Sequence, residues 1–135
     1  MVETDSLENY YTRKGIGGSN PPVSVDKKYL PMNIRFFDVR LEKFIHSLDG
    51  PTIAKTLRTV DLLEMFGHQL GLPHSKKVNT RLFELRIQGK QEVRIFYTFH
   101  KNEAILLHGF VKKSQRIPKR EMLTALQKLY ALDSI

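Results

Sequence analysis

The stretch that decides the fold is residues 81–99, which read RLFELRIQGKQEVRIFYTF. Apolar and polar side chains alternate on both sides of a Gly-Lys-Gln turn, and this period of two is typical of β-strands. We therefore predict strands over Arg81–Gln88 and Glu92–Phe99, joined as an antiparallel hairpin around Gly89.

The register of this hairpin has two alternatives. A two-residue turn would pair Gln88 with Gln91 and put Arg86 on the apolar face. A three-residue turn through residues 89–91 pairs Gln88 with Glu92 instead. This register gathers on one face the side chains of Phe83, Leu85, Ile87, Val93, Ile95 and Tyr97. Because a slip of one residue would expose that whole set, the hydrophobic pattern favours the three-residue turn.

The favoured register has a consequence for charge. It places Arg86 opposite Arg94 on the face away from the core, near Glu84. Two like charges directly opposed on a sheet destabilise it unless an anion bridges them. An anion site is the preferred interpretation, and the alternatives are that a carboxylate neutralises the pair or that both side chains splay into water.

The flanking sequence predicts the remaining elements. Helical spacing of apolar residues alternates with shorter apolar runs, and Asp49-Gly50-Pro51 separates the first two helices. We predict a strand at Asn33–Phe37, helices at Val39–Leu48, Pro51–Phe66 and Pro118–Leu132, and a central strand at Ala104–Val111. The order strand, helix, helix, strand, strand, strand, helix predicts an α+β domain over residues 32–135, with a mostly antiparallel sheet.

Residues 1–31 differ from the rest of the chain. Residues 15–22 are rich in Gly and Pro and lack an apolar period, so we expect a flexible N-terminal tail. A further hypothesis is that Met32 is the natural start. The N-terminus has no secretory signal pattern, and no apolar run is long enough for a membrane span.

The charge of the chain indicates its partners. The net charge is +8, and residues 1–31 contribute nothing to it because they hold four basic and four acidic residues. A compact domain with such an excess attracts polyanions, although a simple solubility charge would look the same. The chain has no cysteine, which excludes disulfides and thiolate metal sites and is compatible with the cytoplasm. We predict neither a metal site nor a cofactor.

A second basic cluster follows the central strand. Lys112, Lys113 and Arg116 end that strand, and Lys119 and Arg120 lie in the first turn of the last helix. Basic residues at a helix N-terminus oppose the helix dipole, whereas a phosphate there would be stabilised. The alternative interpretation is a solvated basic turn.

Several blocks in their order resemble a known family. The match covers about residues 33–131. The blocks are Leu82-Phe83-Glu84-Leu85-Arg86, Val93-Arg94-Ile95-Phe96-Tyr97, the stretch from Ile105 to Gln115, Pro118 with its helix, and the upstream loop from Leu70 to Lys77. Together they are similar to the phage-derived HigB-type branch of the RelE/ParE toxin superfamily.

The resemblance implies a microbial-RNase-like fold and a toxin that cleaves mRNA in the ribosomal A site, where it also contacts ribosomal RNA. The implied reaction is attack of a ribose 2′-OH on its own 3′-phosphate. Carried over by residue, Arg86 and Lys113, with Lys112, are expected to hold the scissile phosphate, and Arg94 matches an arginine of the second hairpin strand. The RNA-binding residues expected around them are Lys76, Lys77, Arg81, Arg116, Lys119 and Arg120. The implied partner is a HigA-like helix-turn-helix antitoxin.

General acid–base work is assigned to a lysine in the basic site or to His74 or His108. We expect His74 to be a loop residue and His108 a partly buried packing residue. Tyr97 has the parity of a core side chain. Ile117 departs from the family, which has Thr or Ser at the position that caps the last helix.

Two other functions share this fold or charge. A ParE-like inhibitor of DNA gyrase has no need of the basic pair Lys112–Lys113 together with Arg86 and Arg94. A nucleic-acid-binding module without catalysis would keep the charge and lack toxicity. The cluster favours cleavage over both.

Overall fold

The computed structural model describes residues 31–134. The tail predicted over residues 1–31 lies outside this range except for its last residue. The elements run in the order β1 (Asn33–Phe36), α2 (Val39–His46), α3 (Gly50–Phe66), the short 3-10 helix η2 (Gly67–Gln69), β2 (Ser75–Lys77), β3 (Phe83–Ile87), β4 (Val93–His100), β5 (Glu103–Val111) and α4 (Lys119–Asp133).

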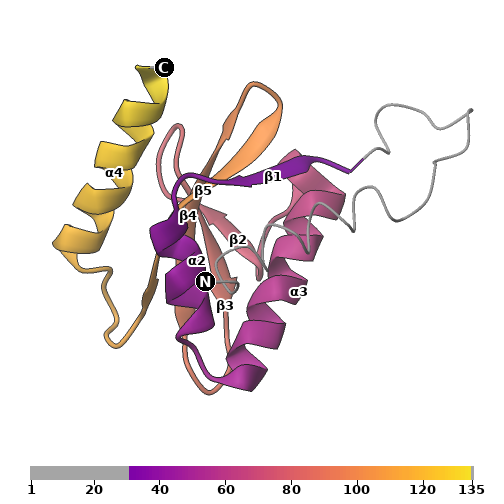
Figure 1. Cartoon of the computed structure of the whole chain (residues 1–135), viewed down its shortest axis with the longest axis vertical. Helices are drawn as coiled ribbons and strands as arrows, with labels where there is room; N and C mark the ends of the chain where they lie inside the picture. The colour runs from indigo at the N-terminus through magenta and orange to yellow at the C-terminus, as the bar shows by residue number, and fades with distance from the viewer. Residues whose placement is uncertain (1–30, 135) are drawn as a thin grey trace, which may run out of the picture.

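Within residues 31–134, the strands form one five-stranded sheet in the order β1-β5-β4-β3-β2. β1 pairs parallel to β5, and every other neighbouring pair is antiparallel. The α+β class with a mostly antiparallel sheet is therefore confirmed, and Figure 1 shows the helices on the outside of the sheet. The strand β2 was not predicted, because three residues reading Ser-Lys-Lys carry no apolar alternation.

The predicted hairpin register is confirmed. Ile87 pairs with Val93, and Arg86 pairs with Arg94. The turn between β3 and β4 follows from this register, and the six predicted apolar side chains of the hairpin face the helices α2 and α3. These helices supply Leu41, Ile45, Val60 and Leu63 to the same core.

The two helices of this face begin where the sequence provides caps. The Asp38 side chain accepts a hydrogen bond from the Arg40 N–H at the start of α2. The Asp49 side chain accepts one from the Thr52 N–H at the start of α3, whose first turn also contains Pro51. Both are N-caps of the kind that satisfy a free N–H of the first helical turn.

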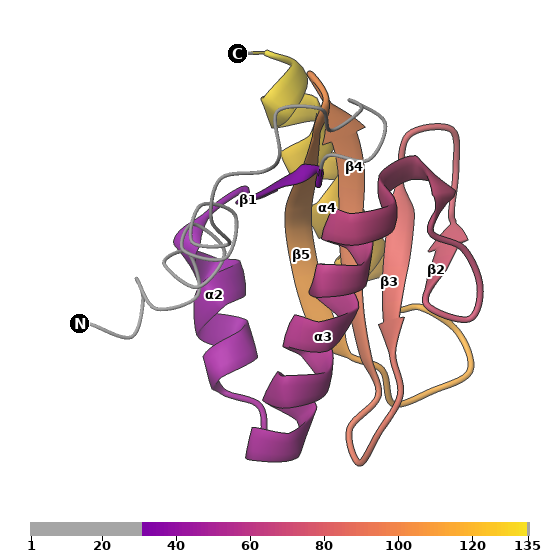
Figure 2. The ribbon, with the colours of Figure 1, turned by 90° about the vertical axis from the view of Figure 1, so that its right-hand side faces the viewer.

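The opposite face of the sheet is not open to water, which corrects one expectation. α4 packs on it and builds a second core (Figure 2). This core contains Leu82, Phe96, Ile105, Leu107, Phe110, Ala125, Leu129 and Leu132. Arg94 shares this face and is 2% exposed. The expectation that this face lies away from the core was wrong for Arg94, because both faces of a sheet are buried when helices cover both.

Gly109 of β5 is a point of close approach between α2 and the sheet. A Cβ atom at this position would lie 2.9 Å from Leu41 Cδ1 and 2.9 Å from two ring atoms of Phe44. Real Cβ atoms do not come so close to other heavy atoms, so the packing of α2 on β5 depends on the missing side chain.

We predict that Gly109→Ala destabilises the domain by about 1–3 kcal/mol, because Leu41 and Phe44 must shift out of their positions. Urea denaturation followed by circular dichroism measures this change. Gly71→Ala is the matched control, since nothing lies within 4 Å of a Cβ there. Equal urea midpoints for the two variants would contradict the close packing.

Candidate nucleic-acid interface

Arg94 is the most buried charged residue of the predicted site. Its Nε lies 3.9 Å from Glu84 Oε1, and its Nη2 lies 3.8 Å from Glu92 Oε2. Its Nη1 donates a 3.2 Å hydrogen bond to the Val93 carbonyl oxygen. Arg94, predicted as a catalytic residue, is 2% exposed and lies between two carboxylates at ion-pair distance, and its Nε has no hydrogen-bond partner in the described part of the chain.

Arg86 lies beside Arg94 and has a different environment. Its side chain is 28% exposed, and its Nε is 3.8 Å from Glu84 Oε2. Glu84 therefore lies between the two opposed arginines and reduces their repulsion, which is one of the alternatives that the sequence left open. At 3.8 Å this contact is no hydrogen bond, and the buried Arg86 Nε has no hydrogen-bond partner in the described part of the chain.

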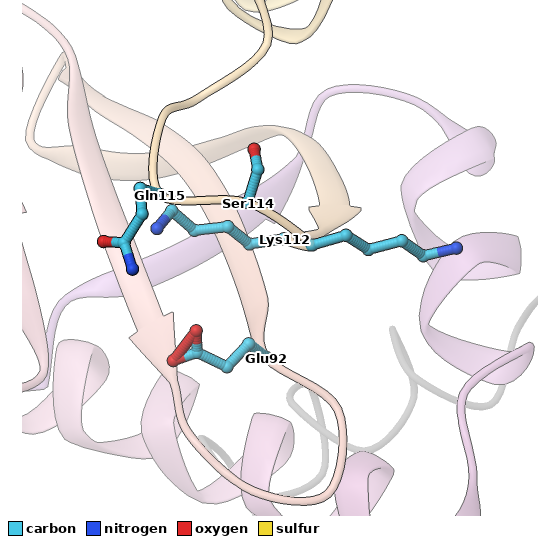
Figure 3. Close-up of a pocket in the computed structure, with 5 residues that line it drawn as sticks. Glu92, Lys112, Ser114 and Gln115 are labelled. Carbon is cyan, nitrogen blue, oxygen red and sulfur yellow. The ribbon is translucent and has the colours of Figure 1, made fainter.

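The predicted lysine pair lines an open pocket of about 560 Å³ after the end of β5. Its wall is formed by Lys112, Lys113, Ser114, Gln115 and Glu92. Figure 3 shows Glu92 on the chain that enters β4, facing the segment that carries Ser114 and Gln115. The Lys112 N–H donates a 2.7 Å hydrogen bond to the Glu92 carbonyl oxygen and holds the two segments together.

Glu92 is the residue that sequence reasoning missed. It lies two residues before Arg94 on the same face of the hairpin, and its side chain is 42% exposed. The signal was present in the alternation, where Glu84, Arg86, Glu92 and Arg94 share one parity across the turn. A carboxylate beside two lysines and a buried arginine can accept a proton or orient a hydroxyl group.

The structure does not bring Arg86 and Lys113 into one pocket. Lys113 belongs to the pocket after β5, whereas Arg86 lines a second pocket beside α3. Between them lie Glu84, Arg94 and Glu92, linked by the contacts given above. The predicted site is therefore an extended basic surface with two hollows.

The remaining predicted RNA-binding residues lie in different settings. Lys76 and Lys77 are exposed on the edge strand β2, and Arg116 and Lys119 are exposed around the start of α4. Arg120 is 87% exposed and lies 3.5 Å from Glu121. Arg81 donates two hydrogen bonds of 2.6 and 2.7 Å to Asp133, so its guanidinium anchors the end of α4.

The candidate histidines and the tyrosine lie outside the lysine pocket. His108 is 20% exposed, as expected, and its Nε2 is 2.6 Å from Glu121 Oε1 on α4. His74 is an exposed loop residue. Tyr97 is a core residue with its hydroxyl 2.6 Å from Ser75 Oγ, and burial raises the pKa of the phenol. α4 begins at Lys119, and its N-cap residue is Pro118 instead of Ile117; no side chain caps the helix.

Residues 31–134 lack two kinds of feature. No group of three or more His, Asp or Glu residues is arranged to hold a metal ion there. In the same range, no helix combines the length and the apolar character that a membrane crossing needs.

A family model described as "Phage derived protein Gp49-like (DUF891)" matches residues 43–130. The chain belongs to this phage-derived Gp49-like family. The match extends from α2 to α4, so it includes the hairpin, the lysine pocket and both arginines. The Gp49-like family is associated with RelE-like toxins, which agrees in part with the resemblance found in the sequence. No curated protein matches the chain.

Replacing Arg94 tests its role inside this member of the Gp49-like family. We predict that Arg94→Met destabilises the protein by about 3 kcal/mol, because it removes the buried cation of the buried Glu84 and leaves only the partly exposed Arg86 beside that carboxylate. Arg86→Met is the control and should cost less, since Arg86 is partly exposed. Chemical denaturation distinguishes them, and a larger destabilisation in the control would refute the assignment.

The Arg81–Asp133 pair makes a prediction about pH. Hydrogen bonds from Arg81 hold the pKa of Asp133 below its ordinary value of 3.8. The pair therefore stabilises α4 above that value, and the stabilisation disappears as the pH falls through the lower pKa of the folded state. NMR titration of Asp133 should show the lowered pKa, and Arg81→Gln should return it towards 3.8. An unchanged titration in that variant would rule the pair out as the cause.

Proposed function

We propose that this protein is the toxin of a type II toxin–antitoxin system and cleaves mRNA on the ribosome. The observation that carries the proposal is the pocket in which Lys112 and Lys113 lie beside Glu92. The RelE-like association of the Gp49-like family supports it.

The proposed reaction is a transesterification of RNA. The ribose 2′-oxygen forms a bond to the adjacent phosphorus while the bond from phosphorus to the 5′-oxygen of the next nucleotide breaks. The products are a 2′,3′-cyclic phosphate and a 5′-hydroxyl end. Negative charge accumulates on the phosphoryl oxygens in the transition state, and fixed cations stabilise it more there than in the ground state.

Each residue of the pocket has a role in this proposal. Lys113 and Lys112 contact the phosphoryl oxygens, and one ammonium group donates the proton that the departing 5′-oxygen needs. Glu92 accepts the proton of the 2′-hydroxyl, since it is the carboxylate that lines this pocket in the described part of the chain. Arg94 positions Glu92 from behind, at 3.8 Å. Arg86 holds the RNA backbone on the other side of Glu84.

The proposed partners follow from the same surface. The substrate is mRNA in the ribosomal A site, where the +8 charge of the chain also favours contact with ribosomal RNA. A HigA-like antitoxin with a helix-turn-helix fold is the proposed inhibitor, and the cytoplasm is the proposed location. A ParE-like gyrase inhibitor and a non-catalytic binding module remain the alternatives, and neither makes use of a carboxylate in the same pocket as the two lysines.

The central test is Lys113→Ala. Removal of one group that stabilises developing charge costs about 10²- to 10³-fold in rate, so we expect a similar reduction of cleavage. The readout is the mapping of RNA ends on translated messages after induction in cells. Arg86→Ala/Lys113→Ala should give a folded and harmless protein. Lys43→Ala is the control, since Lys43 is an exposed lysine of α2.

Each outcome has a clear meaning. Breaks in translated regions that disappear in Lys113→Ala and persist in Lys43→Ala support the proposal. Full cleavage by the double variant would overturn it. Intact mRNA with stalled gyrase–DNA complexes would favour the ParE-like alternative, and intact RNA without toxicity would favour a binding module.

A further inference from the structure

A second cationic pocket lies on the other side of the arginine pair, between α3 and the edge of β3. Its volume is about 480 Å³. α3 contributes Lys55 and Arg58, the connection before β2 contributes His74, and β3 contributes Arg86. Figure 2 shows α3 lying alongside β3, so the pocket is formed by segments that are distant in the sequence.

The pocket exists because β2 is short. β2 begins at Ser75, so beyond this residue the edge of β3 has no neighbouring strand within residues 31–134. The Arg86 N–H donates a 2.8 Å hydrogen bond to the His74 carbonyl oxygen, which closes one wall. Lys55 Nζ donates a 2.7 Å hydrogen bond to the Gln88 carbonyl oxygen, which closes the other. The residues that meet here are thus held by hydrogen bonds to backbone atoms.

The cationic side chains of this pocket have N–H groups that no described residue accepts. Within residues 31–134, Arg58 has no hydrogen bond or ion pair from its side chain, and Lys55 has no carboxylate partner. Lys55 uses one of its three N–H groups on Gln88. Arg86 borders the pocket at the edge of β3, and its guanidinium lies on the α4 face beside Glu84, at 3.8 Å, with its Nε buried without a hydrogen-bond partner in this range.

None of the described residues that line the pocket is a carboxylate. Surface cations are ordinarily interspersed with acidic residues, and Lys55 and Arg58, one turn apart on α3, repel one another in this pocket unless an anion enters. Arginine forks and lysine ammonium groups together suit the tetrahedral oxygens of a phosphate.

We propose that this pocket binds a backbone phosphate of the RNA strand, next to the nucleotide held at Lys112 and Lys113. That the phosphate belongs to RNA rests on the proposed function, whereas the binding of a phosphate group is inferred from the residues of the pocket alone. Arg86 lines this pocket and is linked through Glu84 and Arg94 to the lysine pocket, so a single strand that follows the basic surface passes from one to the other. The pocket anchors the substrate and takes no part in bond cleavage.

The test uses the full chain and a 2′-O-methyl oligoribonucleotide, which binds without being cleaved because it lacks the attacking hydroxyl. Binding is measured by fluorescence anisotropy at several salt concentrations. Lys55→Gln/Arg58→Gln should weaken binding about tenfold, the size expected when one charged hydrogen bond is removed. The slope of log affinity against log salt should become shallower by about 0.7 when one phosphate group is no longer neutralised.

The matched control is Lys43→Gln/Lys101→Gln, which also removes two charges from exposed positions, on α2 and in the β4–β5 turn. The control should keep the salt slope of the unsubstituted protein. Lys55 and Arg58 are exposed on α3, and glutamine is a good helix former, so the test variant should keep its fold. If the double variant unfolds at a lower temperature than the unsubstituted protein, Arg58→Gln alone replaces it in the binding measurement.

The outcomes separate this inference from the proposed function. Equal slopes in test and control variants overturn it, as does a failure of the unsubstituted protein to bind the oligonucleotide. Titration with inorganic phosphate, followed by the NMR signals of the His74 ring, tests the other source of the anion. If phosphate binds there while RNA affinity is equal in both variants, the RNA assignment is wrong. If the slopes differ but translated mRNA stays intact, the pocket stands and the proposed endonuclease does not.

Discussion

The arrangement of the whole basic surface depends on one buried cation. Arg94 lies on the α4 side of the sheet at 2% exposure, and it is held between Glu84 and Glu92 at 3.9 and 3.8 Å. A buried charge is tolerated only where opposite charges and hydrogen bonds offset its desolvation. Arg94 lies between the two carboxylates, with Glu84 also beside Arg86 on one side and Glu92 lining the lysine pocket on the other.

This constraint also explains why the sheet has two different faces. On the α2–α3 side the side chains of the hairpin are apolar throughout, and the core is continuous. On the α4 side an apolar cluster around Phe96 and Phe110 shares the face with Arg94 and Glu84. Arg94 lies near the start of β4, beside the end of β5, and the lysine pocket is formed where β5 ends. The buried charges of this face are thus placed next to the lysines.

The lysine pocket and the pocket beside α3 differ in composition, and this difference fits a reactive role for the first and a binding role for the second. The lysine pocket after β5 contains a carboxylate, which can accept a proton. The pocket beside α3 contains cations and a histidine and no carboxylate among the described residues, which suits binding of an anion without chemistry. If an RNA strand is bound at one pocket and cleaved at the other, the binding energy gained at the first pocket orients the phosphodiester bond that reacts at the second.

The sequence by itself determined the α+β class, the three-residue turn and the opposition of Arg86 and Arg94, because a period of two and the spacing of helical residues are local properties of the chain. The charge of residues 112–113 drew attention to them, and the family resemblance predicted their role. Only the tertiary structure decided that Arg94 is buried, that Glu92 and the lysines line one pocket, and that Lys55 and Arg58 line another at the edge of β3. These relations depend on where α3 and α4 pack against the sheet, and packing between distant segments leaves no periodic signal in either of them.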